Sequence, residues 1–177
     1  MQGRTSHKEC GLTLIELMIA IAVMSIIIFT CTPIFTDLVQ RTLLRQAALG
    51  ILHDIEFTRS SAVLSGHRTS IQKAGESWQN GWFIFHDRNN NGQHDNNEEV
   101  LRARDEVTTL TISANKPVET YVSFIDTGES RRSGSATQGA FIAGSFTICH
   151  PAQPTGYKVI IARGGRARLA TASDEEC

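Results

Sequence analysis

The feature that most limits how this chain folds is an uncharged segment near its N-terminus. Residues 17–36 contain no Asp, Glu, Lys or Arg, and most of them are Ile, Ala, Met, Val, Leu or Phe. An α-helix of that length spans about 30 Å, the thickness of the hydrocarbon core of a bilayer. A helix buried in a globular protein normally keeps a polar face, which this segment lacks. The sequence therefore predicts a membrane-inserted helix, with the remaining chain in water.

The rest of the composition is that of a globular protein. The 177 residues are 41% hydrophobic and 20% charged, which excludes wholesale disorder. The formal net charge is -1, so contact with nucleic acid requires a local basic patch. Two positive residues, Arg4 and Lys8, and one negative residue, Glu9, precede the apolar segment. Positive charge before a membrane helix holds that end of the helix in the cytoplasm. We therefore expect the domain after the helix to lie outside the cytoplasm.

Residues 10–17 read Cys-Gly-Leu-Thr-Leu-Ile-Glu-Leu and resemble the processing motif of type IV prepilins. The resemblance implies that a prepilin peptidase cleaves after Gly11 and methylates the new N-terminus at Leu12, where the family usually has Phe. It also implies that Glu16 faces the amino group of Leu12 on a neighbouring subunit. An ion pair in a medium of low dielectric constant discriminates against a wrong register.

Beyond the apolar segment, the sequence predicts that the helix continues as an amphipathic one. Leu44, Ala48, Ile51 and Ile55 recur at spacings of three and four, to a helix end near residue 65. A bend is expected near Pro33. The expected parts are a leader at 1–11, a membrane and filament-core helix at 12–36, an amphipathic helix at 37–65 that packs on the head, and a β-rich head at 66–177.

After Gly66 the sequence indicates short strands, because segments rich in Val, Ile, Phe, Tyr and Thr alternate with Gly, Asn, Asp and Ser. The expected fold class is α+β: a long N-terminal helix followed by an antiparallel pilin-like sheet or two small sheets. The polar segment 126–139 is expected to be a mobile loop. Expected strands are 69–73, 81–86, 99–104, 108–113, 121–125, 140–148, 157–163 and 166–170.

Four segments of the head resemble the FimT/FimU/GspH group of minor pilins and pseudopilins: 78–87, 99–102, 146–149 and 165–168. The resemblance implies a structural subunit without cofactors, whose partners are other minor and major pilins. It implies a location in the bacterial inner membrane first and in the pilus afterwards. The sequence contains none of the common hydrolase, zinc-protease, dithiol or phosphate-loop motifs, so an enzyme is not expected.

Cys149 and Cys177 are expected on an oxidising side of the membrane, where disulfides persist. A bridge between them would tie the acidic C-terminal tail to the sheet and stabilise the fold by about 3–4 kcal/mol. Two free thiols are the alternative.

Residues 87–98 have the spacing of a calcium-binding loop, with glycine at the sixth position. The flanking segments are expected strands rather than helices, and two inner candidate ligands are Asn, which lowers the negative charge. An Asn- and Gly-rich hairpin turn explains the same residues, and we favour that turn without a metal. The candidate calcium ligands are Asp87, Asn89, Asn91, Asp95 and Glu98.

The segment 163–168 is basic. Arg166 and Arg168 lie on one face of a strand because side chains alternate, and the paired glycines before them suit a tight turn. In FimT-like proteins a Gly-Arg-x-Arg motif at this place is associated with DNA binding in natural transformation. The resemblance implies contact with double-stranded DNA by Arg166 and Arg168, with Arg163 as a helper. Alternatively, these arginines pair with the acidic residues 174–176.

Other functions remain open at this point. One alternative is a subunit that primes filament assembly and binds no ligand. Another is a GspH-like pseudopilin of a type II secretion system. An inner-membrane enzyme is a third reading, which the absence of catalytic motifs disfavours.

Overall fold

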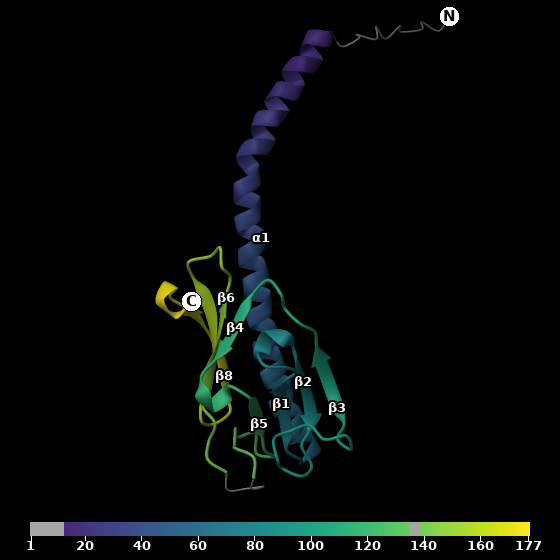
Figure 1. Cartoon of the computed structure of the whole chain (residues 1–177), viewed down its shortest axis with the longest axis vertical. Helices are drawn as coiled ribbons and strands as arrows, with labels where there is room; N and C mark the ends of the chain where they lie inside the picture. Colours follow the sequence, from purple (N-terminus) through teal and green to yellow (C-terminus); the bar gives the residue numbers. More distant parts are fainter. Residues whose placement is uncertain (1–12, 135–138) are drawn as a thin grey trace, which may run out of the picture. The chain divides into compact units, whose positions relative to one another are not determined.

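The computed structural model describes residues 13–134 and 139–177. Over this range the chain forms one long helix, α1 (Leu14–Ser65), and then two antiparallel sheets (Figure 1). The chain divides into two compact units, residues 1–39 and 40–177. The strands are β1 (Thr69–Lys73), β2 (Trp82–His86), β3 (Val100–Arg104), β4 (Thr111–Ala114), β5 (Tyr121–Phe124), β6 (Gly144–Cys149), β7 (Gly156–Ile161) and β8 (Ala167–Ala172).

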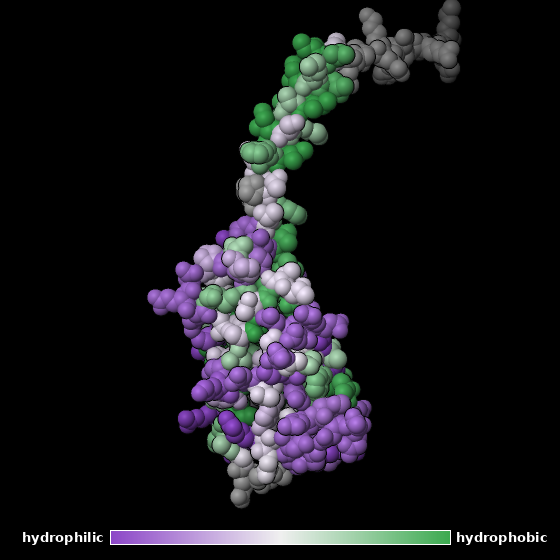
Figure 2. Space-filling model, viewed as in Figure 1, coloured by the Kyte–Doolittle hydropathy of each residue, from purple (hydrophilic) through white to green (hydrophobic). Residues whose placement is uncertain are grey.

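In the first unit, the described residues form the N-terminal part of α1. Its large apolar side chains are exposed, from Leu14 to Phe29 (Figure 2). By length and composition this helix is able to cross a membrane. The N-terminal apolar helix predicted from the sequence is confirmed, and the bend near Pro33 stays a prediction.

The second unit contains the end of α1 and both sheets. The strand order is β3-β2-β1-β5 in one sheet and β4-β6-β7-β8 in the other. Leu44, Ala48, Ile51 and Ile55 of α1 are buried in a core shared with both sheets, as their spacing predicted. The expected α+β class is confirmed.

The two sheets contribute paired apolar residues to this core. Ile71 of β1 lies opposite Ile84 of β2 on one side and Val122 of β5 on the other. In the second sheet, Phe146 of β6 lies opposite Val159 of β7. All five side chains are fully buried or nearly so, and they therefore close the core around α1.

The segment 126–143 differs most from expectation. Strand β6 begins at Gly144 rather than at residue 140, because the preceding residues pair elsewhere: Ile142 N donates to Ser130 O at 3.0 Å. Ser130 is buried and its hydroxyl donates to the Ile142 carbonyl at 2.6 Å. The guanidinium carbon of Arg131, Cζ, lies 3.6 Å from the centroid of the Phe141 ring. The mobile loop expected at 126–139 is therefore hydrogen-bonded in the part that the structure describes, and residues 135–138 lie outside that part.

Candidate nucleic-acid interface

The basic segment forms the tip of the hairpin that joins β7 to β8. Arg168 pairs with Ile160 across this hairpin, and Ala162 N donates to Arg166 O at 2.9 Å. The turn closes with a hydrogen bond from Gly165 N to Ala162 O at 2.8 Å, and Gly165 has a φ of 80°. A glycine in the left-handed region after a tight turn is typical of such hairpins. The paired glycines therefore set up the turn expected from the sequence.

The hairpin tip is held against neighbouring elements. A β-carbon at Gly165 would lie 2.3 Å from the Gly128 carbonyl oxygen, so only glycine permits this approach. The same carbonyl accepts a hydrogen bond from Arg59 Nε at 2.9 Å. Ala167 N donates to the Glu56 carboxylate on α1 at 3.2 Å. These contacts therefore fix the backbone that carries the arginines after the turn.

The arginine side chains point away from the core. Ala167 and Leu169 pack against the core, and Arg168 alternates with them onto the outer face of the sheet, where it is exposed. Arg166 is also exposed, and it stands just before the strand, because β8 begins at Ala167 rather than at residue 166 as expected. Arg163 is exposed in the turn itself. These three guanidinium groups form no hydrogen bond and no ion pair with any other described residue.

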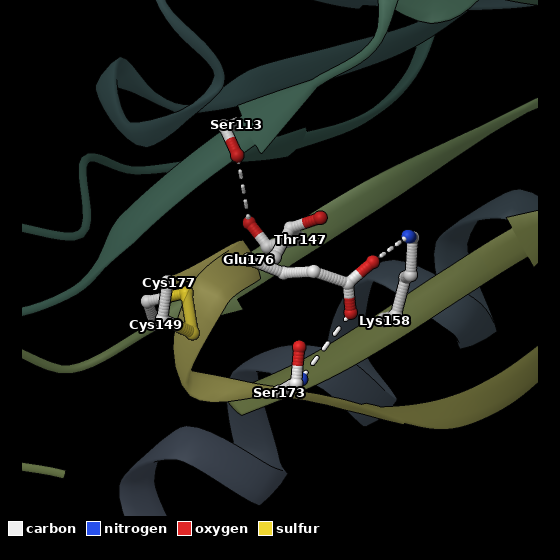
Figure 3. Close-up of a disulfide and its surroundings, with 7 residues drawn as sticks. All are labelled: Ser113, Thr147, Cys149, Lys158, Ser173, Glu176 and Cys177. Atoms are coloured by element: carbon white, nitrogen blue, oxygen red, sulfur yellow. Dashed lines mark hydrogen bonds and ion pairs between the residues drawn. A yellow bond between two sulfur atoms is a disulfide. The ribbon is translucent and has the colours of Figure 1, made fainter. Parts of the chain in front are cut away.

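The acidic C-terminal residues have other contacts. They form a short turn, η3 (Asp174–Glu176), and the structure joins Cys177 to Cys149 of β6 in a disulfide (Figure 3). Glu176 forms an ion pair with Lys158 of β7, and the hydrogen bond from Lys158 lowers the pKa of Glu176. The alternative in which residues 174–176 pair with the hairpin arginines is therefore not the arrangement of the described chain.

Gly156 makes room for this disulfide. A β-carbon at Gly156 would lie 2.7 Å from Cys177 Sγ and 3.3 Å from Cys149 Sγ. Gly156 pairs with Ala172, the last residue of β8, which is buried. The disulfide therefore packs over the end of the sheet, and it holds η3 on the outer face.

The candidate calcium ligands in residues 87–98 bond to the loop itself. The Asp87 carboxylate accepts hydrogen bonds from Asn91 N at 3.0 Å and Gly92 N at 2.9 Å, and burial raises the pKa of Asp87. Asn89 and Asn91 donate their amides to Asp95 at 2.6 and 2.8 Å. Glu98, which is buried, accepts from the backbone N–H groups of residues 88 and 95.

The same loop lies over the outer face of the first sheet. The His94 ring meets Phe83 and Phe85 edge-on, with ring centroids 5.3 Å apart in both cases. Asp87 accepts a hydrogen bond from Ser70 of β1 at 3.2 Å. In residues 13–134 and 139–177, no group of three His, Cys, Asp or Glu side chains is arranged to hold a metal ion. These contacts give the Asn-rich residues a structural role, and the turn without a metal stays a prediction.

Two of the three processing residues, Gly11 and Leu12, lie outside the described residues. Glu16 is exposed in the first turn of α1, and its N–H donates to the Thr13 hydroxyl at 3.4 Å. Thr13 and Glu16 have the spacing of a helix capping box. Cleavage and methylation at the leader stay predictions.

Sequence reasoning missed two polar residues that the structure makes prominent. Asp54 of α1 is fully buried and accepts hydrogen bonds from Trp82, Arg102 and Arg104. Lys158 shares the outer face of the second sheet with Arg168. Alternation along β7 marks Lys158 as outward-facing, but only the strand register places it beside the arginines.

Comparison with known proteins identifies the family. The family described as type II transport protein GspH matches residues 47–165, and a prokaryotic N-terminal methylation motif matches residues 6–31. No curated protein matches the chain.

Solved structures show the same fold. The type IV minor pilin FimU of Pseudomonas aeruginosa is 24% identical, with a TM-score of 0.55 over 74% of this chain and 90% of that one. The minor pseudopilin EpsH of the Vibrio cholerae type 2 secretion system is 13% identical, with a TM-score of 0.51 over 72% of this chain and 95% of that one. Together with the two family matches, this fold assigns the chain to the GspH family of minor type IV pilins and pseudopilins.

Proposed function

We propose that this family member enters a type IV pilus and contacts double-stranded DNA at the filament surface during uptake in natural transformation. The observation that carries the proposal is the tip of the β7–β8 hairpin. There Arg163, Arg166 and Arg168 are exposed and have no partner among the described residues. Guanidinium groups bind phosphate oxygens through charge-assisted hydrogen bonds, which makes such a cluster suited to a nucleic-acid backbone.

Affinity for DNA is expected to be modest. The whole chain carries a formal net charge of -1, so attraction to phosphate comes from the hairpin and not from a general positive field. Arg131 follows Ser130, whose hydroxyl lies 3.4 Å from the Arg163 carbonyl oxygen, but it adds nothing because its guanidinium pairs with Glu129 at 2.8 Å. Few phosphate contacts give a weak, salt-sensitive complex without sequence preference.

The route into the filament is part of the same proposal. A prepilin peptidase removes residues 1–11 and methylates Leu12, and the apolar part of α1 anchors the subunit in the inner membrane with the head outside the cytoplasm. In the filament, Glu16 pairs with the N-terminal amine of a neighbouring pilin. The methylation motif at residues 6–31 and the exposed apolar side chains of α1 support this route.

Binding of DNA to the head, residues 40–177, tests the proposal. Band shifts across a salt series compare the wild type with the double variant Arg166→Ala/Arg168→Ala. Each lost phosphate contact lowers the slope of log affinity against log salt by about one unit, so the double variant is expected to lose about two. The matched control is Arg45→Ala/Arg88→Ala, which removes the same charge from two exposed arginines elsewhere. Equal loss in both double variants, or no binding by the wild type at low salt, contradicts the proposal.

The second candidate function is a pseudopilin of a type II secretion system. The GspH family match and the fold shared with EpsH support it. This candidate, like a role limited to pilus assembly, predicts that Arg166 and Arg168 can be replaced without loss of function. Neighbouring genes distinguish the two systems, because pilus-tip genes accompany one and secretion genes the other.

A further inference from the structure

The outer face of the second sheet extends the positive charge of the hairpin toward the C-terminus. Lys158 of β7 lies opposite Ala170 of β8, and Ile160 lies opposite Arg168. Because side chains alternate along each strand, Lys158 and Arg168 project from the same face. Diagonal neighbours in an antiparallel pair lie about 7–8 Å apart, within reach of long side chains. Lys158 is therefore the next cation along from Arg166 and Arg168.

Unlike the guanidinium groups of the three arginines, the ammonium group of Lys158 has a partner of opposite charge. Its ammonium group forms an ion pair with the Glu176 carboxylate, which also accepts a hydrogen bond from Ser173 N at 3.2 Å (Figure 3). Cys177, the residue after Glu176, is joined to Cys149 of β6 by the disulfide, which holds η3 on the sheet. The disulfide and the turn thus hold a carboxylate against Lys158, the cation that shares this face with Arg168.

We infer that Lys158 is a further phosphate-contacting residue of this face, and that the C-terminal turn held by the disulfide masks it with Glu176. The inference rests on the proposed DNA contact and concerns its regulation. Exposed ion pairs are only weakly stabilising. Lys158 and Glu176 are 25% and 40% exposed, so solvent screens their attraction and an incoming phosphate can compete with Glu176 for the ammonium group. The C-terminal turn therefore lowers the affinity of this face for DNA but does not prevent DNA from binding.

The test is a double-mutant cycle on the head, residues 40–177, whose core lies wholly within it. The probe is a double-stranded DNA fragment, titrated across a salt series. Glu176→Gln removes the charge but keeps an acceptor for Ser173 N. We expect this variant to bind more tightly than the wild type at low salt, with a slope steeper by about one unit. Between roughly 50 and 200 mM salt, it should lose about threefold more affinity than the wild type.

Two further variants separate the mask from a general charge effect. Glu175→Gln removes the same charge from the same turn, at an exposed residue that forms no ion pair with another described residue, and is expected to change the slope little. Lys158→Gln is expected to cancel the gain of Glu176→Gln when the two are combined. An equal gain for Glu175→Gln and Glu176→Gln overturns the inference, and so does a gain that survives Lys158→Gln.

The inference and the proposed function fail in different ways. If binding depends on Arg166 and Arg168 but Glu176→Gln leaves affinity and slope unchanged, the mask is overturned and DNA contact stands. If neither the wild type nor Glu176→Gln binds DNA at low salt, both are overturned. Near-ultraviolet circular dichroism of each variant confirms that the head stays folded.

Discussion

Gly165 shows how a residue in a functional motif can be required by the backbone. Its φ of 80° and the approach of the Gly128 carbonyl both exclude a side chain. Gly165→Ala should therefore destabilise the head by about 1–3 kcal/mol, measured by urea unfolding. Gly164→Ala is the matched control, because a β-carbon there meets no atom within 4 Å, and we expect a change within about 0.5 kcal/mol. Equal effects at the two glycines would contradict this account of the turn.

Asp54 is a second residue whose surroundings decide its effect. The carboxylate is fully buried and contacts Arg102 Nη1 at 2.7 Å and Arg104 Nε at 2.8 Å. Removing one partner of a buried ion pair leaves the other charges poorly compensated. Asp54→Asn should cost about 3 kcal/mol of unfolding free energy at pH 7, at the low end for such pairs because both arginines are partly exposed. Asp126→Asn replaces an exposed carboxylate and is the control. If Asp54→Asn lowers the unfolding free energy no more than this control does, the buried ion pair does not stabilise the head.

The same carboxylate predicts a pH dependence. Burial acts to raise the pKa of Asp54, but the hydrogen bonds from Arg104, Arg102 and Trp82 outweigh it and lower the pKa below its usual value. A carboxyl group with a lowered pKa stabilises the fold above its unfolded-state pKa, and this contribution is lost as pH falls through the folded-state pKa. The stability gap between wild type and Asp54→Asn should therefore narrow on acidification below about pH 4. A gap that stays the same as the pH falls further below about 4 would contradict a lowered pKa for Asp54.

The disulfide links strand β6 to the terminal turn across 28 residues of chain. Closing a loop of that length lowers the entropy of the unfolded chain, by a model that gives about 3.5 kcal/mol. The variant Cys149→Ser/Cys177→Ser should unfold at correspondingly lower urea concentration. Wild type measured with and without reductant provides the control, since reduction should reproduce the loss seen in the variant. Equal midpoints under both conditions would show that the bridge adds no stability.

Elements with a strong local pattern could be predicted from the sequence. The spacing of Leu44, Ala48, Ile51 and Ile55 marks the buried face of α1, and alternation along β8 places Arg168 on the outer face of the second sheet. What escaped prediction depends on contacts between distant segments, whose register no local pattern encodes. The pairing of residues 130–131 with 141–142 is one such contact, and the cover that the Asn-rich loop gives to the first sheet is another.

Apolar side chains have two separate roles in this protein. Those of residues 14–29 are exposed along α1, and an exposed apolar surface of this kind is typical of a site that contacts a membrane or another protein. Those that build the core begin at Leu44. The stability of the head should therefore be independent of the N-terminal unit, residues 1–39.

Truncation tests this independence. Full chain in detergent and the fragment 40–177 should have the same unfolding free energy of the head within about 0.5 kcal/mol, because no core side chain is removed. The fragment 53–177 loses Leu44, Ala48 and Ile51, all nearly inaccessible to solvent, from the shared core. Loss of one buried Leu or Ile side chain alone costs about 2–5 kcal/mol, against a total stability of about 5–15 kcal/mol for a typical domain. We therefore expect 53–177 not to fold, and Leu44→Ala in 40–177 to be intermediate. A full chain that is clearly more stable than 40–177 would show instead that the head depends on the membrane helix.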